Sequence, residues 1–68
     1  MNLRINGDAQ DIEDNTLLAQ LIESLTGESN PQGVAVAIKG SVISRSRWAE
    51  HLLCADDDIE ILGAVSGG

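Results

Sequence analysis

The sequence is poor in the residues that most small enzymes and secreted domains depend on. Its 68 residues include one cysteine, one histidine, one tryptophan, and no tyrosine or phenylalanine. Cys54 alone cannot form an internal disulfide, and His51 alone leaves no Cys and His cluster for a metal. With Trp48 as its one aromatic residue, any core has to be aliphatic. A chain this short predicts one domain near the lower size limit for a single core, without an enclosed active site.

Basic residues are also scarce, with four Lys and Arg against eleven Asp and Glu and a formal net charge of −7. This charge disfavours nucleic acids and anionic membranes as partners, and it favours solubility and a basic protein partner. Neither a bilayer-spanning apolar run nor a signal-peptide core follows Met1. We therefore expect a cytoplasmic protein that binds neither nucleic acid nor membranes.

The first residues predict a β-hairpin. Leu3 and Ile5 alternate with polar residues, which is the period of a half-buried strand. Asn6-Gly7-Asp8 then supplies the residues of a tight turn, because Asn and Gly tolerate positive φ. A second strand is expected over about residues 9–13.

One amphipathic helix is expected after the hairpin. Residues 14–16 (Asp-Asn-Thr) offer capping side chains, and Gly27 is a natural stop. Apolar residues between them recur at helical spacing, at Leu17, Leu18, Leu21, Ile22 and Leu25. The polar residues Gln20, Glu23 and Ser24 would then face water, so the helix would cover a sheet with one side only.

The second half of the chain predicts three more strands. Residues 28–33 form a loop, and residues 34–38 are a small apolar run that we expect to form a central strand. A turn at Lys39-Gly40 leads to a short partner strand at residues 42–43. The last strand is expected over about residues 59–62, after an acidic turn at residues 56–58.

The segment between these strands, residues 44–55, predicts little regular structure. One helical turn capped by Ser44 or Ser46 is expected, after which Leu52 and Leu53 would point inward. We expect Trp48 to cap the core and His51 to be structural. Arg45 and Arg47 would pair with the acidic surface. The three aspartates at 56–58 lack the spaced ligands of a calcium site, so no metal is expected there.

This order of elements predicts an α+β fold, in which a mixed sheet of four to five strands packs on one amphipathic helix. The first and last strands can then lie side by side as parallel neighbours at the centre. Residues 1–62 would form the domain and residues 63–68 a flexible tail with a reach of roughly 20 Å.

The sequence ends in Gly67-Gly68, directly after apolar residues. Glycine has no Cβ and wide φ/ψ freedom, so such an end can enter a narrow channel. Its α-carboxylate is ionised at neutral pH and inert until it is activated, for example by adenylation with ATP. A frayed terminus is the plain alternative, but Ile61, Leu62 and Val65 keep this segment apolar almost to its end.

Three stretches resemble the ThiS family, the sulfur carriers of thiamine thiazole biosynthesis in the ubiquitin-like β-grasp group. They are Asn6-Gly7, residues 42–51 with the pattern Arg45-x-x-Trp48-Ala49-x-His51, and residues 59–68 with the Gly-Gly end. Other β-grasp carriers share this end but generally not the second stretch. The resemblance covers essentially the whole chain and implies a β-grasp domain. Two departures are Asp57, where these sequences usually have glycine, and Gly63, where a bulkier residue is often found.

The resemblance implies a carrier, a protein cosubstrate without catalytic residues, cofactor or metal of its own. An adenylyltransferase related to ubiquitin-activating enzymes would use ATP to adenylate the carboxylate of Gly68. A cysteine desulfurase or other persulfide donor would then supply sulfur and leave a thiocarboxylate, from which thiazole synthase would take the sulfur. The tail residues Ala64, Val65, Ser66 and Gly67 would contact the partners, with Ala64 and Val65 pairing in a groove.

Other functions stay open beside this one. The small subunit of molybdopterin synthase uses the same thiocarboxylate, although that family is longer and generally lacks the Trp48-Ala49-x-His51 pattern. The chain could also be a ubiquitin-like modifier or a plain interaction module with an accidental Gly-Gly end. An enzyme acting through Cys54 is disfavoured, because no Cys-x-x-Cys is present and the nearby acidic residues oppose thiolate formation.

Overall fold

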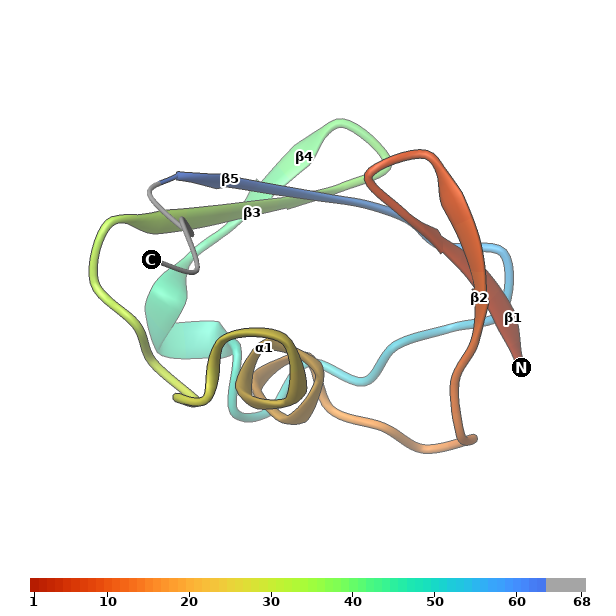
Figure 1. The fold of residues 1–68 in the computed structure, drawn as a ribbon, viewed down its shortest axis with the longest axis horizontal. Coiled ribbons are helices and arrows are strands. Elements are labelled where there is room, and N and C mark those ends of the chain that lie inside the picture. Colours follow the sequence, from red (N-terminus) through yellow and green to blue (C-terminus); the bar gives the residue numbers. More distant parts are fainter. Residues whose placement is uncertain (64–68) are drawn as a thin grey trace.

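The computed structural model describes residues 1–63, in which a five-stranded sheet curves over one helix (Figure 1). The elements in chain order are β1 (Asn2–Ile5), β2 (Asp8–Asp11), α1 (Leu18–Thr26), β3 (Val34–Ile38), β4 (Ser41–Ile43), the 3₁₀ turn η1 (Arg45–Arg47) and β5 (Asp58–Gly63). The strand order is β2-β1-β5-β3-β4, with β1 and β5 parallel and the other neighbours antiparallel. The predicted mixed sheet with parallel first and last strands is confirmed. β3 lies inside the sheet as expected, and β5 takes the middle place beside β1, in line with the predicted central pair of first and last strands.

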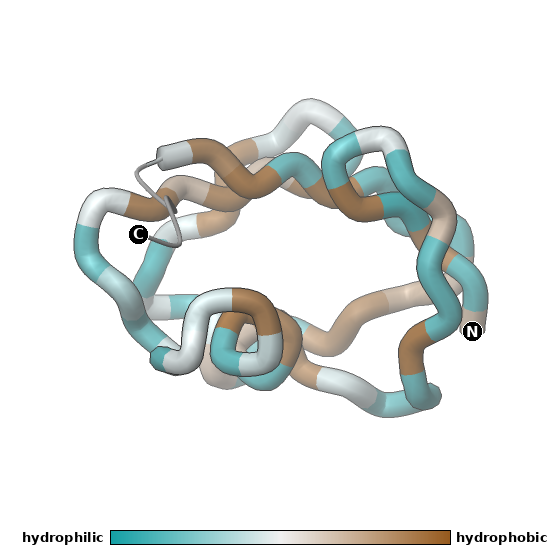
Figure 2. The backbone as a smooth tube through the Cα atoms, in the orientation of Figure 1, coloured by the Kyte–Doolittle hydropathy of each residue, from teal (hydrophilic) through white to brown (hydrophobic). Residues whose placement is uncertain are grey.

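The core between sheet and helix is aliphatic, as the composition predicts. Figure 2 shows apolar segments on the strands and on α1 around this shared interior. Trp48 is buried, as predicted, and its indole Nε1 donates a hydrogen bond to the Ile43 carbonyl at 3.0 Å, so its one polar atom is satisfied. The buried apolar residues are Leu3, Ile5, Leu18, Leu21, Ile22, Val34, Val36, Ile38, Trp48, Leu53 and Ile59.

Helix α1 buries a narrower stripe than its sequence predicts. Leu18, Leu21 and Ile22 are buried, and each contributes about 1.5–3 kcal/mol of hydrophobic stabilisation. Leu25, in the last turn of the helix, is 45% exposed. The polar face is as predicted, with Gln20, Glu23 and Ser24 exposed.

The predicted side-chain cap of α1 is wrong. Leu17 is the N-cap residue, and its N–H donates to Gln20 Oε1 at 2.8 Å. The Thr16 hydroxyl donates instead to a carbonyl three residues earlier, at 2.7 Å. The C-terminal prediction is confirmed, since Gly27 ends the helix with φ +91°.

Smaller differences concern the edges and the segment after η1. β2 begins one residue earlier and ends two residues earlier than predicted, and all of its residues are exposed at the sheet edge. The 3₁₀ turn follows Ser44, but no side chain caps it. Leu53 is buried as expected, whereas Leu52 is 52% exposed, so only one of the two points inward.

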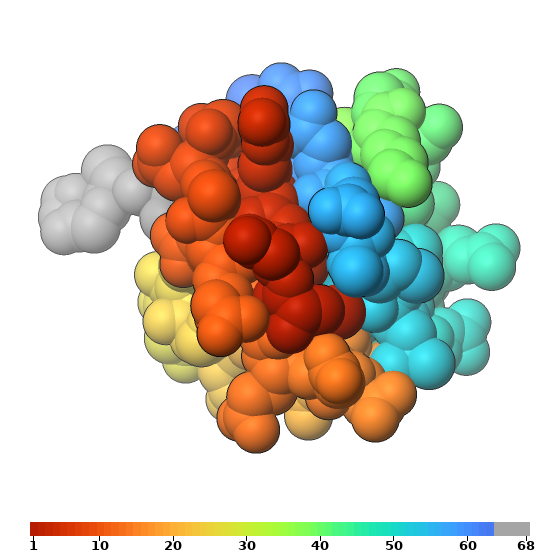
Figure 3. All heavy atoms as spheres, turned by 90° about the vertical axis from the view of Figure 1, so that its right-hand side faces the viewer, coloured from red at the N-terminus to blue at the C-terminus, as the bar shows by residue number. Residues whose placement is uncertain are grey.

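The N-terminal hairpin and the segment before β5 lie side by side (Figure 3), where the Asp56 N–H donates to the Asn2 carbonyl at 2.8 Å. This contact continues the β1–β5 pairing toward the start of β1. Within residues 1–63, no helix is long and apolar enough to cross a membrane.

Candidate functional site: the end of strand β5

The predicted functional residues Ala64, Val65, Ser66, Gly67 and Gly68 lie outside the described residues. The structure does describe the backbone from which they continue. We call this region the tail base and define it as residues 61–63 of β5 with the facing residues Gly33 and Val34. The chain reaches it from the middle of the sheet, so the core fixes its position.

On the β1 side, the Asn6 side chain extends the pairing of β5 beyond the end of β1. The Asn6 N–H donates to the Ile59 carbonyl at 2.8 Å, and Asn6 Oδ1 accepts the Ile61 N–H at 2.8 Å. The φ of Asn6 is +52°, a conformation that asparagine tolerates better than most residues. The Asn6-Gly7 motif is thus more than a turn, because it also holds β5 near the tail base.

On the β3 side, β5 pairs up to its last residue, with Gly63 opposite Val34. Gly63 has φ +131°, and a Cβ added to it would lie 1.9 Å from the Gly33 carbonyl oxygen. The two backbones therefore approach more closely than any L side chain at residue 63 allows.

The loop that faces Gly63 is held by Arg45. One guanidinium nitrogen of Arg45 donates to Asn30 Oδ1 at 2.6 Å and to the Pro31 carbonyl, and the other donates to the Val34 carbonyl at 3.2 Å. The predicted ion pair of Arg45 with the acidic surface is therefore wrong. The physical reason is that the guanidinium fork satisfies several carbonyl and amide oxygens at once, which a single carboxylate cannot replace.

The face of the sheet turned away from α1 carries exposed apolar residues next to the tail base. Leu62 is 59% and Val42 is 77% exposed. Leu62 pairs with Ala35, while Val42 and Glu60 both pair with Ala37, so all five share this face. We call these five residues the outer patch. One of the five, Glu60, is acidic.

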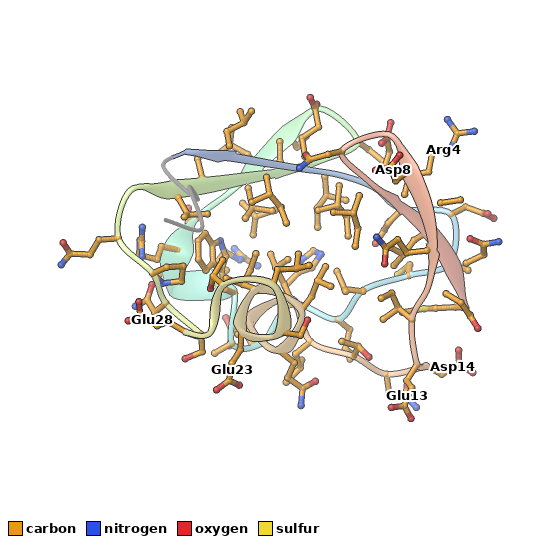
Figure 4. All side chains as sticks on the ribbon, viewed as in Figure 1. Arg4, Asp8, Glu13, Asp14, Glu23 and Glu28 are labelled. Atoms are coloured by element: carbon orange, nitrogen blue, oxygen red, sulfur yellow. The ribbon has the colours of Figure 1, made fainter. Side chains whose placement is uncertain are left out.

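Acidic side chains also project away from the core elsewhere on the molecule. Figure 4 shows this for Asp8, Glu13, Asp14, Glu23 and Glu28. Because they come from the hairpin, the loop before α1, the helix and the loop after it, negative charge is distributed around the fold rather than gathered in one site.

Asp57, one of the two departures noted in the sequence, is buried at 5% exposure. Its Oδ2 accepts the Cys54 N–H at 2.8 Å, and its Oδ1 lies 3.9 Å from Lys39 Nζ. The carboxylate thus closes the turn before β5.

Cys54 is exposed, and His51 is half-buried with its carbonyl accepting the Leu18 N–H at 2.8 Å. Across residues 1–63, no three His, Cys, Asp or Glu side chains are placed to hold a metal ion.

Comparison with known proteins agrees with this architecture. The ThiS family model matches residues 3–68. Among solved structures, the crystal structure of the thiamine biosynthesis protein ThiS from Geobacter metallireducens aligns over 100% of both chains, with a TM-score of 0.80 and 24% sequence identity. At this identity the likeness shows the fold, and the predicted β-grasp architecture is confirmed. No curated protein matches the chain.

Proposed function

The chain belongs to the ThiS family, and from this premise we propose that it is a sulfur carrier of thiamine biosynthesis whose reacting group is the α-carboxylate of Gly68. The observation that carries the proposal is the family match, which runs through Gly67 and Gly68. The position of β5 supports it, since the middle strand of the sheet leads directly toward these residues. On this proposal the chain is a protein cosubstrate rather than an enzyme.

The chemistry proceeds in steps carried out by partner enzymes. A carboxylate oxygen of Gly68 attacks the α-phosphorus of ATP, which forms an acyl-adenylate and releases pyrophosphate. The terminal sulfur of a persulfide, such as one made by a cysteine desulfurase, then attacks the acyl carbon and displaces AMP. A second thiol reduces the resulting acyl disulfide, which leaves a thiocarboxylate on Gly68 and a disulfide on the donor. Thiazole synthase uses this sulfur for the thiazole ring of thiamine.

The residues of the chain bind and orient rather than catalyse. Gly67 and Gly68 would pass through a narrow channel of the adenylyltransferase, since they lack side chains. Ala64, Val65 and Ser66 would bind in an extended groove before it. The outer patch beside the tail base is suited to hold the globular part, because exposed apolar residues next to the acidic Glu60 match an apolar surface with a basic neighbour.

The test is to incubate the protein with a ThiS-family adenylyltransferase, ATP and a persulfide donor, and then to measure intact mass. Exchange of one carboxylate oxygen for sulfur adds about 16 mass units, which is also the nominal shift for oxidation of Met1, Cys54 or Trp48. Fragmentation of the C-terminal peptide and alkylation of the new sulfur therefore have to place the change on Gly68.

The matched control is the same chain with one alanine added after Gly68. It keeps every residue of the fold but moves the reacting carboxylate away from the glycine, so we expect no ATP-dependent sulfur on it. If the unextended chain gains no sulfur while the enzyme loads another carrier, the proposal is wrong. If the chain instead becomes joined to lysine side chains, it is a ubiquitin-like modifier.

A further inference from the structure

Gly63 is the one residue of β5 with a positive φ, and it lies where β5 ends against the loop before β3. We propose that the backbone contact between Gly33 and Gly63 sets the position and direction in which residues 64–68 leave the sheet. Gly63 is then a positioning residue for the Gly68 carboxylate. This inference rests on the proposed function, in which that carboxylate has to reach a partner's active site.

The contact leaves no space for a side chain. A Cβ on Gly63 would lie 1.9 Å from the Gly33 carbonyl oxygen and 3.0 Å from both the Gly33 carbonyl carbon and the Val34 Cα. These three atoms belong to the backbone, so none of them can turn aside as a side chain would. An L residue at 63 therefore has to separate the end of β5 from β3.

The loop backbone that faces Gly63 is held in place by hydrogen bonds from Arg45. Arg45 donates hydrogen bonds to the carbonyls of Pro31 and Val34, on both sides of Gly33, and to the Asn30 side chain. Its guanidinium also lies over the ring of the buried Trp48. Because this loop is tied to the core, a clash at residue 63 displaces β5 rather than the loop.

β5 is also held just before the contact, by the hydrogen bond from the Ile61 N–H to Asn6 Oδ1. The displacement of β5 is thus limited to residues 62–63, and it changes the direction of the five residues that follow. Five residues span at most about 17 Å, so a change of direction at their start moves their far end by several ångström. At a reacting atom, a misplacement of about 1 Å can lower a rate about 100-fold.

Gly40 provides a matched control within the chain. Its φ is +83°, so alanine there also meets an unfavourable backbone conformation, yet an added Cβ has nothing within 4 Å. Gly40 lies in the β3–β4 turn, beyond Ile38 and at the opposite end of β3 from Val34. Gly40→Ala therefore has the conformational cost of alanine without the contact at the tail base.

The decisive comparison uses both mirror forms of alanine at residue 63. Cys54, the sole cysteine, permits ligation of a synthetic peptide of residues 54–68 to a thioester of residues 1–53 without changing the sequence at the junction. Three full-length chains are made, with Gly63, Gly63→Ala and Gly63→D-Ala. D-alanine favours positive φ and carries its methyl group on the other side of the Cα, away from the position that clashes with Gly33.

In ATP–pyrophosphate exchange with the adenylyltransferase, we expect Gly63→Ala to lower kcat about 10- to 100-fold. The KM for the carrier should change less than kcat, because four of the five residues of the outer patch lie outside the displaced residues 62–63. Gly63→D-Ala and Gly40→Ala should retain kcat. Equal loss with both alanine forms, or unchanged kcat in Gly63→Ala, would overturn the inference. Absence of exchange with the unsubstituted chain would instead count against the carrier function.

A second readout needs no partner enzyme. Residual dipolar couplings of the amides of residues 64–68 report their direction relative to the sheet. We expect Gly63→Ala to change these couplings, while Gly63→D-Ala and Gly40→Ala leave them as they are. Equal couplings in all four chains would overturn the inference whatever the result with ATP.

Discussion

The guanidinium of Arg45 lies over the indole ring of Trp48, with 5.0 Å between its carbon and the ring centroid. The same guanidinium donates to the carbonyls of Pro31 and Val34. One side chain thus connects the chain's only aromatic residue, the turn η1 and the loop that faces the tail base. The Arg45-x-x-Trp48 pattern is explained by this connection.

Arg45→Lys should lower the free energy of unfolding by about 1–3 kcal/mol, because lysine keeps the charge over the ring but cannot donate to three oxygens from a planar fork. Urea unfolding followed by Trp48 fluorescence measures this. Arg47→Lys is the control, since Arg47 is exposed in the same turn, and it should change stability by less than about 0.5 kcal/mol. Equal effects of the two substitutions would contradict the role given to Arg45.

Asn6→Gly should expose the Ile61 N–H to faster hydrogen exchange while the rest of the sheet stays protected. Glycine accepts the φ of +52° at this position but has no oxygen to offer, so the change isolates the side-chain hydrogen bond. Asn6→Asp keeps an acceptor and should retain protection of this amide. Hydrogen exchange of the Ile61 amide is measured by NMR in both variants. Full protection of this amide in Asn6→Gly would show that the bond is dispensable.

Asp57→Ala should lower the free energy of unfolding by about 1–3 kcal/mol, since it leaves the Cys54 N–H without its charged acceptor in the turn before β5. Asp57→Asn should have a smaller effect, because its amide oxygen can still accept this bond. The exposed neighbour Asp58 is the control, and Asp58→Ala should change stability by less than about 0.5 kcal/mol. The denaturant midpoints of the three variants and the unsubstituted protein are compared. An Asp57→Ala variant with an unchanged free energy of unfolding would refute the structural role of Asp57.

Leu62→Ser should raise the KM of the adenylyltransferase for the carrier about 5-fold or more, because it removes an exposed apolar side chain from the outer patch. The kcat should change little, since the tail base keeps its backbone contacts. Leu52→Ser is the matched control, because Leu52 is similarly exposed but pairs with Leu17 beside the helix. If both substitutions raise KM equally, the partner does not bind on the outer patch.

The parts of the fold that follow from the sequence are those with a repeating pattern. Leu3 and Ile5 are buried on β1 as their alternation predicts, and Leu18, Leu21 and Ile22 are buried on α1 as their spacing predicts. The parallel pairing of β1 and β5 also follows, because a hairpin at each end and one helix leave few other ways to close the sheet.

The contacts around the tail base could not be predicted, because each depends on where another element places its backbone. In the sequence, Arg45 has the features of an ordinary surface charge. Only the structure shows that the carbonyls of residues 31 and 34 face it. In the sequence, Asn6 has the features of a turn residue. Its bond to β5 depends on that strand lying beside it. The Gln20 cap could not be predicted either, because Gln20 reaches back from inside the helix to accept the Leu17 N–H.

The middle place of β5 also affects how the protein is made. Ile59, fully buried at the centre of the fold, is translated after every other core residue, and its strand separates β1 from β3. The sheet cannot close while the ribosome still holds this strand, and pairing between distant segments is slow compared with local helix formation. A chain that still lacks β5 therefore has no closed sheet, and it also lacks the outer patch, to which β5 contributes Glu60 and Leu62.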